Sequence, residues 1–273
     1  CRRRGGPVTS PFIRRLLRSA VFLTITCSPV FLAPNWLFFL VVEVFILFAL
    51  NEFLSLAETK GIVINRLLGL FFGGLLPFSF FFPSDSIILV IACLSFFLFN
   101  FHRRLREQAL VSTSVTLFGV IYVAWFFSYL TKIKYLPQGS WWVFYTILLV
   151  KGGDAGAYFV GKSFGKMKLI EHVSPNKSVE GAIAGLVTTI LLSFVSKLYL
   201  VHVDFLHLFI LGTAVGILAQ LGDLAESLIK RDVGVKDSGH IPGLGGVLDV
   251  LDSLILSAPF VYFYVTTFPG VLG

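Results

Sequence analysis

The stretch LGDLAESLIKRD sets acidic, hydroxyl and basic side chains at helical spacing. In a helix, Asp223, Glu226, Ser227 and Lys230 stand at i, i+3, i+4 and i+7 and share one face, with Arg231 beside it. Carboxylates bind divalent metal ions and basic groups bind phosphate oxygens, so this combination suits a metal-bound polyphosphate. The alternative is a solvated amphipathic helix end with an i, i+4 ion pair.

A second stretch, IPGLGGVLDVLDS, joins a glycine-rich turn to acids at the start of an apolar segment. Backbone N–H groups of Gly243, Gly245 and Gly246, with a helix N-terminus behind them, would form an anion site. Asp249 and Asp252 follow at i and i+3. An ionised carboxylate at the edge of an apolar span is costly unless it is paired or metal-bound, which favours a functional Asp249. The alternative is a turn followed by an acid that stabilises the helix dipole.

A third region comprises KGGDAGAYFVGKSFGKMKL and, shortly after it, SPNKSVEG. Asp154 stands at the end of an apolar segment there. Ser174 and Pro175 predict a helix N-cap followed by proline at the first helical position. Lys177 would then lie in the first turn, where a cation opposes the dipole but can bind phosphate. The Gly-Lys repeats bind phosphate or simply mark a basic loop.

The segments that must position these residues are strongly apolar. Of 273 residues, 56% are hydrophobic and 14% are charged, and the mean hydropathy is +0.87. Soluble domains are only about half apolar and about a quarter charged. The sequence therefore predicts an all-α polytopic membrane protein with about nine transmembrane helices. The predicted spans are about 17–32, 36–56, 67–82, 87–101, 111–130, 141–160, 182–200, 205–224 and 247–268.

Lysine and arginine alternate across these spans. With a cytoplasmic N-terminus, 19 of the 22 Lys and Arg residues fall on the cytoplasmic side, as the positive-inside rule expects. The three on the other side are Lys132, Lys134 and Lys197. This skew accounts for the net charge of +7 without nucleic-acid binding, and it places the loops at 151–180 and 225–246 on one cytoplasmic face. We divide the chain into N-terminal helices, 1–140, and a catalytic transmembrane region with cytoplasmic loops, 141–273.

The stretch GDLAESLIKRDVGVKDSGHIPGLGGVLDVLDS resembles the C-terminal signature of the phosphatidate cytidylyltransferase (CDP-diacylglycerol synthase) family. That signature reads roughly S-x-x-K-R-x4-K-D, a proline-glycine turn, H-G-G and L-D-R-x-D. GDAGAYFVGKSFGK and SPNKSVEG resemble the upstream blocks of the family in the same order. The resemblance covers about 141–260, and the N-terminal half matches only as a hydrophobic pattern.

The resemblance implies conversion of CTP and phosphatidic acid to CDP-diacylglycerol and pyrophosphate during phospholipid biosynthesis. It also implies a divalent metal, Mg2+, often together with a monovalent cation such as K+. The implied setting is a homodimer in a bacterial inner membrane or an organelle equivalent, with the active site facing the cytoplasm.

The resemblance also assigns roles to residues. The expected metal ligands are Asp223 and Asp249, with Asp154 and Glu226 as further candidates. The expected catalytic residues are Lys230, Arg231, Lys236 and Asp237. The expected phosphate-binding residues are Lys177, Ser227, Gly243, Gly245 and Gly246.

This sequence departs from the signature in three places. Leu244 replaces the usual histidine, Val250 replaces the usual arginine, and the turn between Asp237 and Pro242 is one residue short. The first two departures indicate that neither side chain is indispensable here, or that activity is weakened.

Two other functions remain open. A CTP-dependent lipid kinase of similar fold would transfer the γ-phosphate and release CDP. An ion-coupled transporter would use Asp154 and Asp249 as ion or proton sites near the bilayer midplane.

Overall fold

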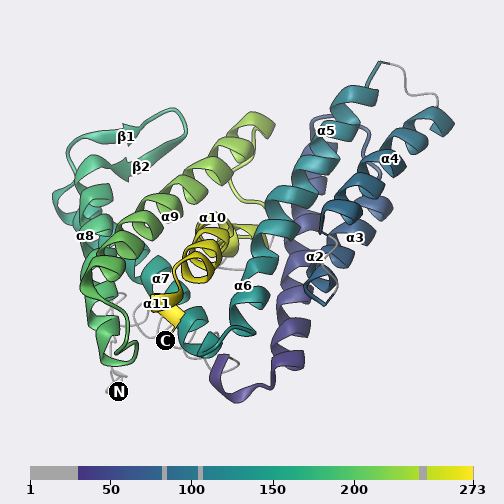
Figure 1. Ribbon diagram of the computed structural model, residues 1–273. Coiled ribbons are helices and arrows are strands. Elements are labelled where there is room, and N and C mark those ends of the chain that lie inside the picture. The colour runs from purple at the N-terminus through teal and green to yellow at the C-terminus, as the bar shows by residue number, and fades with distance from the viewer. Residues whose placement is uncertain (1–29, 82–84, 104–106, 240–244, 273) are drawn as a thin grey trace, which may run out of the picture.

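The computed structural model describes residues 30–81, 85–103, 107–239 and 245–272, and in these ranges it is helical apart from one short hairpin (Figure 1). The first elements are α2 (Asn35–Thr59), α3 (Arg66–Leu75) with the 3-10 turn η1 (Leu76–Phe80), α4 (Asp85–Arg103), α5 (Ala109–Gly119), the π-helical η2 (Val120–Trp125) and α6 (Phe126–Lys134). The later elements are α7 (Gly139–Phe164), β1 (Lys168–Ile170), β2 (Ser174–Ser178), α8 (Val179–Val195) with η3 (Ser196–Leu198), α9 (Phe205–Val233), α10 (Val247–Thr267) and α11 (Pro269–Leu272).

Six helices in the described ranges are long and apolar enough to cross a membrane. They are Asn35–Thr59, Ala109–Lys134, Gly139–Phe164, Val179–Leu198, Phe205–Val233 and Val247–Thr267. Two shorter apolar helices, Arg66–Phe80 and Asp85–Phe101, coincide with the predicted spans 67–82 and 87–101. The all-α polytopic class is thus confirmed. The predicted span 17–32 lies almost wholly outside the described residues, so the count of nine stays a prediction.

Helix α9 is longer than the predicted span 205–224. It continues to Val233 and ends at Gly234, which adopts the left-handed conformation (φ 80°) common at helix C-termini. Lys230 and Arg231 lie in its last turn, where cations favour the helix dipole. The residues from Asp223 to Lys230, which are predicted to share one face of a helix, therefore do lie in a helix.

The hairpin corrects the prediction that Ser174 and Pro175 begin a helix. These residues belong to β2, which pairs antiparallel with β1. The N-cap is Ser178, whose hydroxyl accepts a hydrogen bond from the Gly181 N–H at 3.1 Å. Pro175 is tolerated because each strand of a two-stranded sheet has a free edge. Lys177 consequently lies on a strand rather than in the first helical turn.

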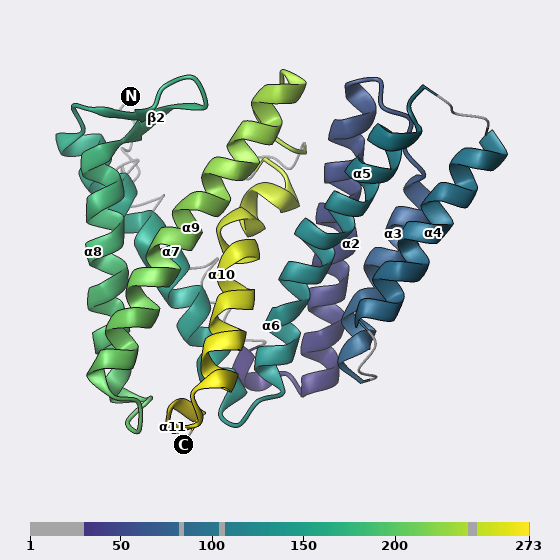
Figure 2. The same ribbon diagram turned by 45° about the horizontal axis from the view of Figure 1, so that its top comes forward.

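Helix α10 lies between two groups of helices, with α7, α8 and α9 on one side and α2 and α6 on the other (Figure 2). Its side chains are buried on several faces, as expected of a central helix that is apolar nearly all round. Because α2 and α6 precede residue 140, the two predicted regions pack together, and the boundary between them stays a prediction.

The charged segments gather at one end of the bundle. The hairpin, the C-terminal end of α9 and the first turns of α10 lie together at the top of Figure 2. The connections after α6 and α8, near Lys132, Lys134 and Lys197, lie at the opposite end. This arrangement agrees with the predicted alternation of basic residues.

Helices α9 and α10 lie close together at Gly222. A Cβ there would collide with the backbone carbonyl of Asp252 and would lie 3.3 Å from the Ser253 Cα. Backbone atoms cannot rotate away, so any side chain at Gly222 must push the helices apart. The neighbouring Asp223 depends on this contact for its position beside α10.

We predict that Gly222→Ala destabilises the fold by about 1–3 kcal/mol through overpacking. The measurement is thermal unfolding of the purified protein in detergent. The matched control is Gly270→Ala in α11, where nothing lies within 4 Å of the added Cβ. Equal unfolding temperatures for the two variants would contradict the close contact.

Candidate active site

The predicted face of α9 carries the first part of the site. The Asp223 Oδ1 lies 2.7 Å from the Lys177 Nζ, and the Ser227 hydroxyl lies 3.5 Å from the same carboxylate. Both partners of the ion pair are partly exposed, so Lys177 can reach a ligand from the hairpin side. The hairpin and α9 therefore bring together two residues that lie 46 positions apart.

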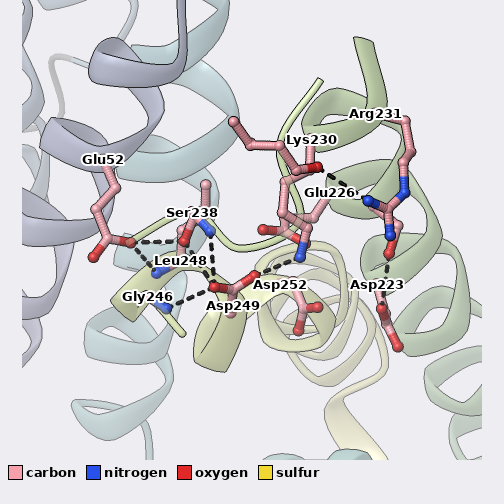
Figure 3. A network of polar contacts seen from close by, with 12 residues as sticks. Glu52, Asp223, Glu226, Lys230, Arg231, Ser238, Gly246, Leu248, Asp249 and Asp252 are labelled. Carbon is pink, nitrogen blue, oxygen red and sulfur yellow. Dashed lines mark hydrogen bonds and ion pairs between the residues drawn. The ribbon is translucent and has the colours of Figure 1, made fainter. Parts of the chain in front are cut away.

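Lys230 links α9 to α10 from within the protein. Its ammonium group forms ion pairs with Glu226 on its own helix and with Asp249 on α10 (Figure 3). The Glu226 side chain is fully buried, and those of Lys230 and Asp249 are nearly so. Buried charges of this kind are tolerated only with close partners, so removing one partner is strongly unfavourable.

Asp249 also closes the turn that precedes α10. Its Oδ2 accepts hydrogen bonds from the Gly246 N–H at 2.6 Å and the Ser238 N–H at 3.0 Å. Gly245 has φ 83°, a left-handed conformation that favours glycine. Because Asp249 already occupies the Gly246 N–H, phosphate binding by this turn stays a prediction. Gly243 and Leu244 lie outside the described residues.

Asp252, one helical turn beyond Asp249, lies in a second acidic group. It is 6% exposed, and its carboxylate accepts a hydrogen bond from the N–H of the next residue, Ser253, at 2.5 Å. Asp223, Lys151 and Asp154 lie within electrostatic range of it. Lys151 lies 3.7 Å from Asp154 and donates to the backbone carbonyl of Val250 at 2.9 Å, which ties α7 to α10.

The two groups form one cluster with more acids than lysines, which we call the acidic cluster. Its described members are Asp154, Asp223, Glu226, Asp249 and Asp252, with Lys151, Lys177 and Lys230. Five carboxyl groups share a poorly solvated place with three ammonium groups, so the surplus acids need either a bound cation or a bound proton.

The donor set suits a magnesium ion. Within the described ranges, no three acids or histidines converge closely enough to form a ready metal cage. Mg2+ does not require one, because it commonly binds one or two carboxylates together with water and substrate phosphates. Carboxylate oxygens are the hard ligands that this ion prefers, so the acidic cluster fits Mg2+ shared with a polyphosphate.

Three predicted residues lie at the edge of the acidic cluster. The Arg231 guanidinium donates to the backbone carbonyls of Val173 and Val235, both at 3.1 Å, and so fastens the hairpin connection to α9. Lys236 and Asp237 are exposed in the connection after α9. Their catalytic roles stay predictions.

Sequence reasoning missed several neighbours. Glu52 of α2 contacts the start of α10. An acid within an apolar run is a candidate functional residue, and this signal could have identified Glu52. Tyr122, on the π-helical η2, is buried within electrostatic range of Asp252, and its hydroxyl has no hydrogen-bond partner among the described residues. π-Helical turns are frequent at functional sites, but this one gives no sequence signal.

Comparison with known proteins extends the similarity beyond these motifs. The profile of the "Cytidylyltransferase family" matches residues 13–268. A phosphatidate cytidylyltransferase of Bacillus subtilis is 36% identical over 233 residues, which cover 81% of this chain and 85% of that protein. Another from Synechocystis is 31% identical over an alignment of 296 positions, which covers 95% of this chain and 98% of that protein. A third, from Haemophilus influenzae, is 45% identical over 134 residues, or 46% of each chain.

We predict that Lys230→Ala costs about 3–5 kcal/mol of stability, because it leaves two buried carboxylates without their partner. The matched control is Lys60→Ala, which breaks the exposed Lys60–Asp232 pair at the same end of the bundle and should cost less than about 1 kcal/mol. Unfolding in detergent measures both variants. A Lys230→Ala protein as stable as the control would show that the buried pairs are not formed.

Proposed function

The chain belongs to the cytidylyltransferase family, and from that premise we propose that it converts CTP and phosphatidic acid to CDP-diacylglycerol and pyrophosphate. The observation that carries this proposal is the acidic cluster, which lies at one end of a bundle of apolar helices. A water-soluble nucleotide and a lipid phosphate can meet there. The relatives named phosphatidate cytidylyltransferase support the same reaction.

The reaction needs little base catalysis. An ionised phosphate oxygen of phosphatidic acid forms a bond to the α-phosphorus of CTP, and the bond from that phosphorus to the bridging oxygen breaks to release pyrophosphate. The obstacle is repulsion between the anions, since two unit charges 4 Å apart interact by ~4 kcal/mol at an effective dielectric near 20. Cationic groups that lower this repulsion are the principal requirement.

Lys177 is the lysine best placed to contact a phosphate. Its side chain is 27% exposed and has one ion-pair partner, Asp223. Lys230 is predicted to be a catalytic residue, yet it is nearly buried between two carboxylates. We assign Lys230 the task of holding Asp249, and Lys177 that of holding substrate.

Asp223 and Asp249 would hold Mg2+, and the buried Asp252 adds a third carboxylate on the same face of α10. When bound, Mg2+ supplies charge neutralisation for the CTP phosphates and the leaving pyrophosphate. The carboxylates of this chain orient the metal-bound phosphates, and Lys151 limits the repulsion among the acids.

The proposal includes a setting. We place the protein in a bacterial inner membrane with the acidic cluster toward the cytoplasm, supported by its bacterial relatives and the skew of basic residues. A homodimer, and K+ beside Mg2+, belong to the same proposal and follow from the family resemblance. A transporter is not favoured, because the acids lie at one end of the bundle. A lipid kinase is not favoured, because the relatives are named for cytidylyl transfer.

The first prediction concerns the product. Purified protein, phosphatidic acid, α-32P-labelled CTP and Mg2+ should move label into the lipid phase, and EDTA should stop the transfer. γ-32P-labelled CTP should leave the lipid unlabelled. Label from the γ-position in lipid would instead establish a kinase, and no transfer by folded protein would refute the proposed reaction.

The second prediction concerns Asp223. Asp223→Asn keeps the size of the side chain but removes its charge, and should lower turnover by at least about tenfold. The matched control is Asp232→Asn, nine residues further along α9, which is exposed and pairs only with Lys60 in the described structure. The turnover of this control should stay within about twofold of wild type, because exposed ion pairs contribute little. Full metal-dependent turnover of Asp223→Asn would defeat the assignment.

A further inference from the structure

Glu52, in the N-terminal helix α2, contacts the beginning of α10 directly. Its Oε1 accepts a hydrogen bond from the Val247 N–H at 2.9 Å. Its Oε2 accepts one from the Leu248 N–H, also at 2.9 Å (Figure 3). The Ser238 hydroxyl also lies 2.9 Å from Oε2. These contacts join positions that lie at least 186 residues apart.

The contacts replace a cap that α10 lacks. The N-cap residue is Gly246, which has no side chain to accept the free N–H groups of the first turn. Among the N–H groups at the start of α10, Asp249 accepts only that of Gly246 itself. Glu52 supplies the missing acceptors, and its negative charge favours the positive end of the helix dipole.

Two glycines leave the space around Glu52. A Cβ at Gly246 would lie 2.7 Å from the Gly239 backbone nitrogen, so a capping side chain there would force the neighbouring backbone to move. It would also meet the Ser238 hydroxyl and the Glu52 carboxylate. A Cβ at Gly239 would lie 2.5 Å from the same carboxylate. The two glycines therefore leave room for an acid that arrives from α2.

The capped turn carries residues of the acidic cluster. Asp249 lies immediately after the two N–H groups that Glu52 binds, and Asp252 follows one turn later. The Ser238 hydroxyl lies 2.9 Å from Glu52 and 3.0 Å from Asp249 and can donate to either. A shift of this turn would move both aspartates relative to Asp223 on α9.

We propose that Glu52 is a positioning residue: it caps α10 from α2 and thereby fixes Asp249 and Asp252 opposite Asp223. It reaches the acidic cluster through Ser238 and the backbone of α10. The catalytic consequence of this inference rests on the proposed function, whereas the cap itself does not depend on that function. It makes the N-terminal helices part of the catalytic apparatus rather than only a membrane anchor.

The test uses Glu52→Gln in the full-length protein. An amide has one acceptor oxygen, so its NH2 group would face the N–H of Val247 or Leu248 and one hydrogen bond is lost. We expect amide hydrogen exchange in peptides covering Val247 and Leu248 to become faster by about tenfold. In the lipid-labelling assay we expect kcat to fall by about tenfold and half-maximal activity to need more Mg2+.

The matched control is Glu58→Gln on the same helix, whose carboxylate contacts Arg66 and lies away from α10. It should leave the exchange rates, kcat and the Mg2+ requirement within about twofold of wild type. A merely structural loss would reduce the active fraction without changing the Mg2+ requirement.

Wild-type exchange at Val247 and Leu248 in Glu52→Gln would overturn the inference. Faster exchange with an unchanged kcat and Mg2+ requirement would overturn the catalytic part. A wild-type protein that forms no lipid product would refute the proposed function instead. The exchange measurement needs no substrate and would still decide whether Glu52 makes the cap.

Discussion

The structure depends on how five carboxylates are held at one end of an apolar bundle. Lys230 forms ion pairs with Glu226 and Asp249, Lys177 forms one with Asp223, and Lys151 forms one with Asp154. Lys177 and Lys230 form ion pairs with residues of other elements, and Lys151 donates a hydrogen bond from α7 to α10. Because three lysines do not balance five acids, we propose that the arrangement binds a further cation. The charge that makes the cluster difficult to bury is thus also what suits it to a metal-bound nucleotide.

Small residues between the helices determine how closely these acids can approach one another. Gly222 lets α9 lie against the backbone of α10 at Asp252, directly beside Asp223. Without that approach the aspartate of α9 and those of α10 would lie too far apart to form one cluster. Close helix contacts through glycine are typical of membrane proteins, where apolar burial gives little drive to association. In this protein the same contact also serves the proposed chemistry.

The sequence predicted much of this organisation and missed the rest for identifiable reasons. Runs of apolar residues located eight of the described helices within a few residues, apart from the C-terminal end of α9, because hydropathy is a local property. The shared face of Asp223 and Lys230 followed from helical spacing. The hairpin was missed because Ser174-Pro175 imitates a helix start, while the true cap is Ser178. Glu52 was not assigned to the site because its partners lie nearly 200 positions away.

The lengths of the helices explain why the acidic cluster lies at the end of the bundle. Helix α9 has 29 residues, or about 43 Å at 1.5 Å per residue, whereas about 20 residues suffice to cross the hydrocarbon. Starting from Phe205, the excess begins close to Asp223, where the charged face begins. Helix α10 begins at Val247 and carries its two aspartates in its first two turns. In the proposed membrane setting, the acids of both helices would therefore meet near the lipid headgroups, where water could deliver a nucleotide while the acyl chains of the lipid remained in the bilayer.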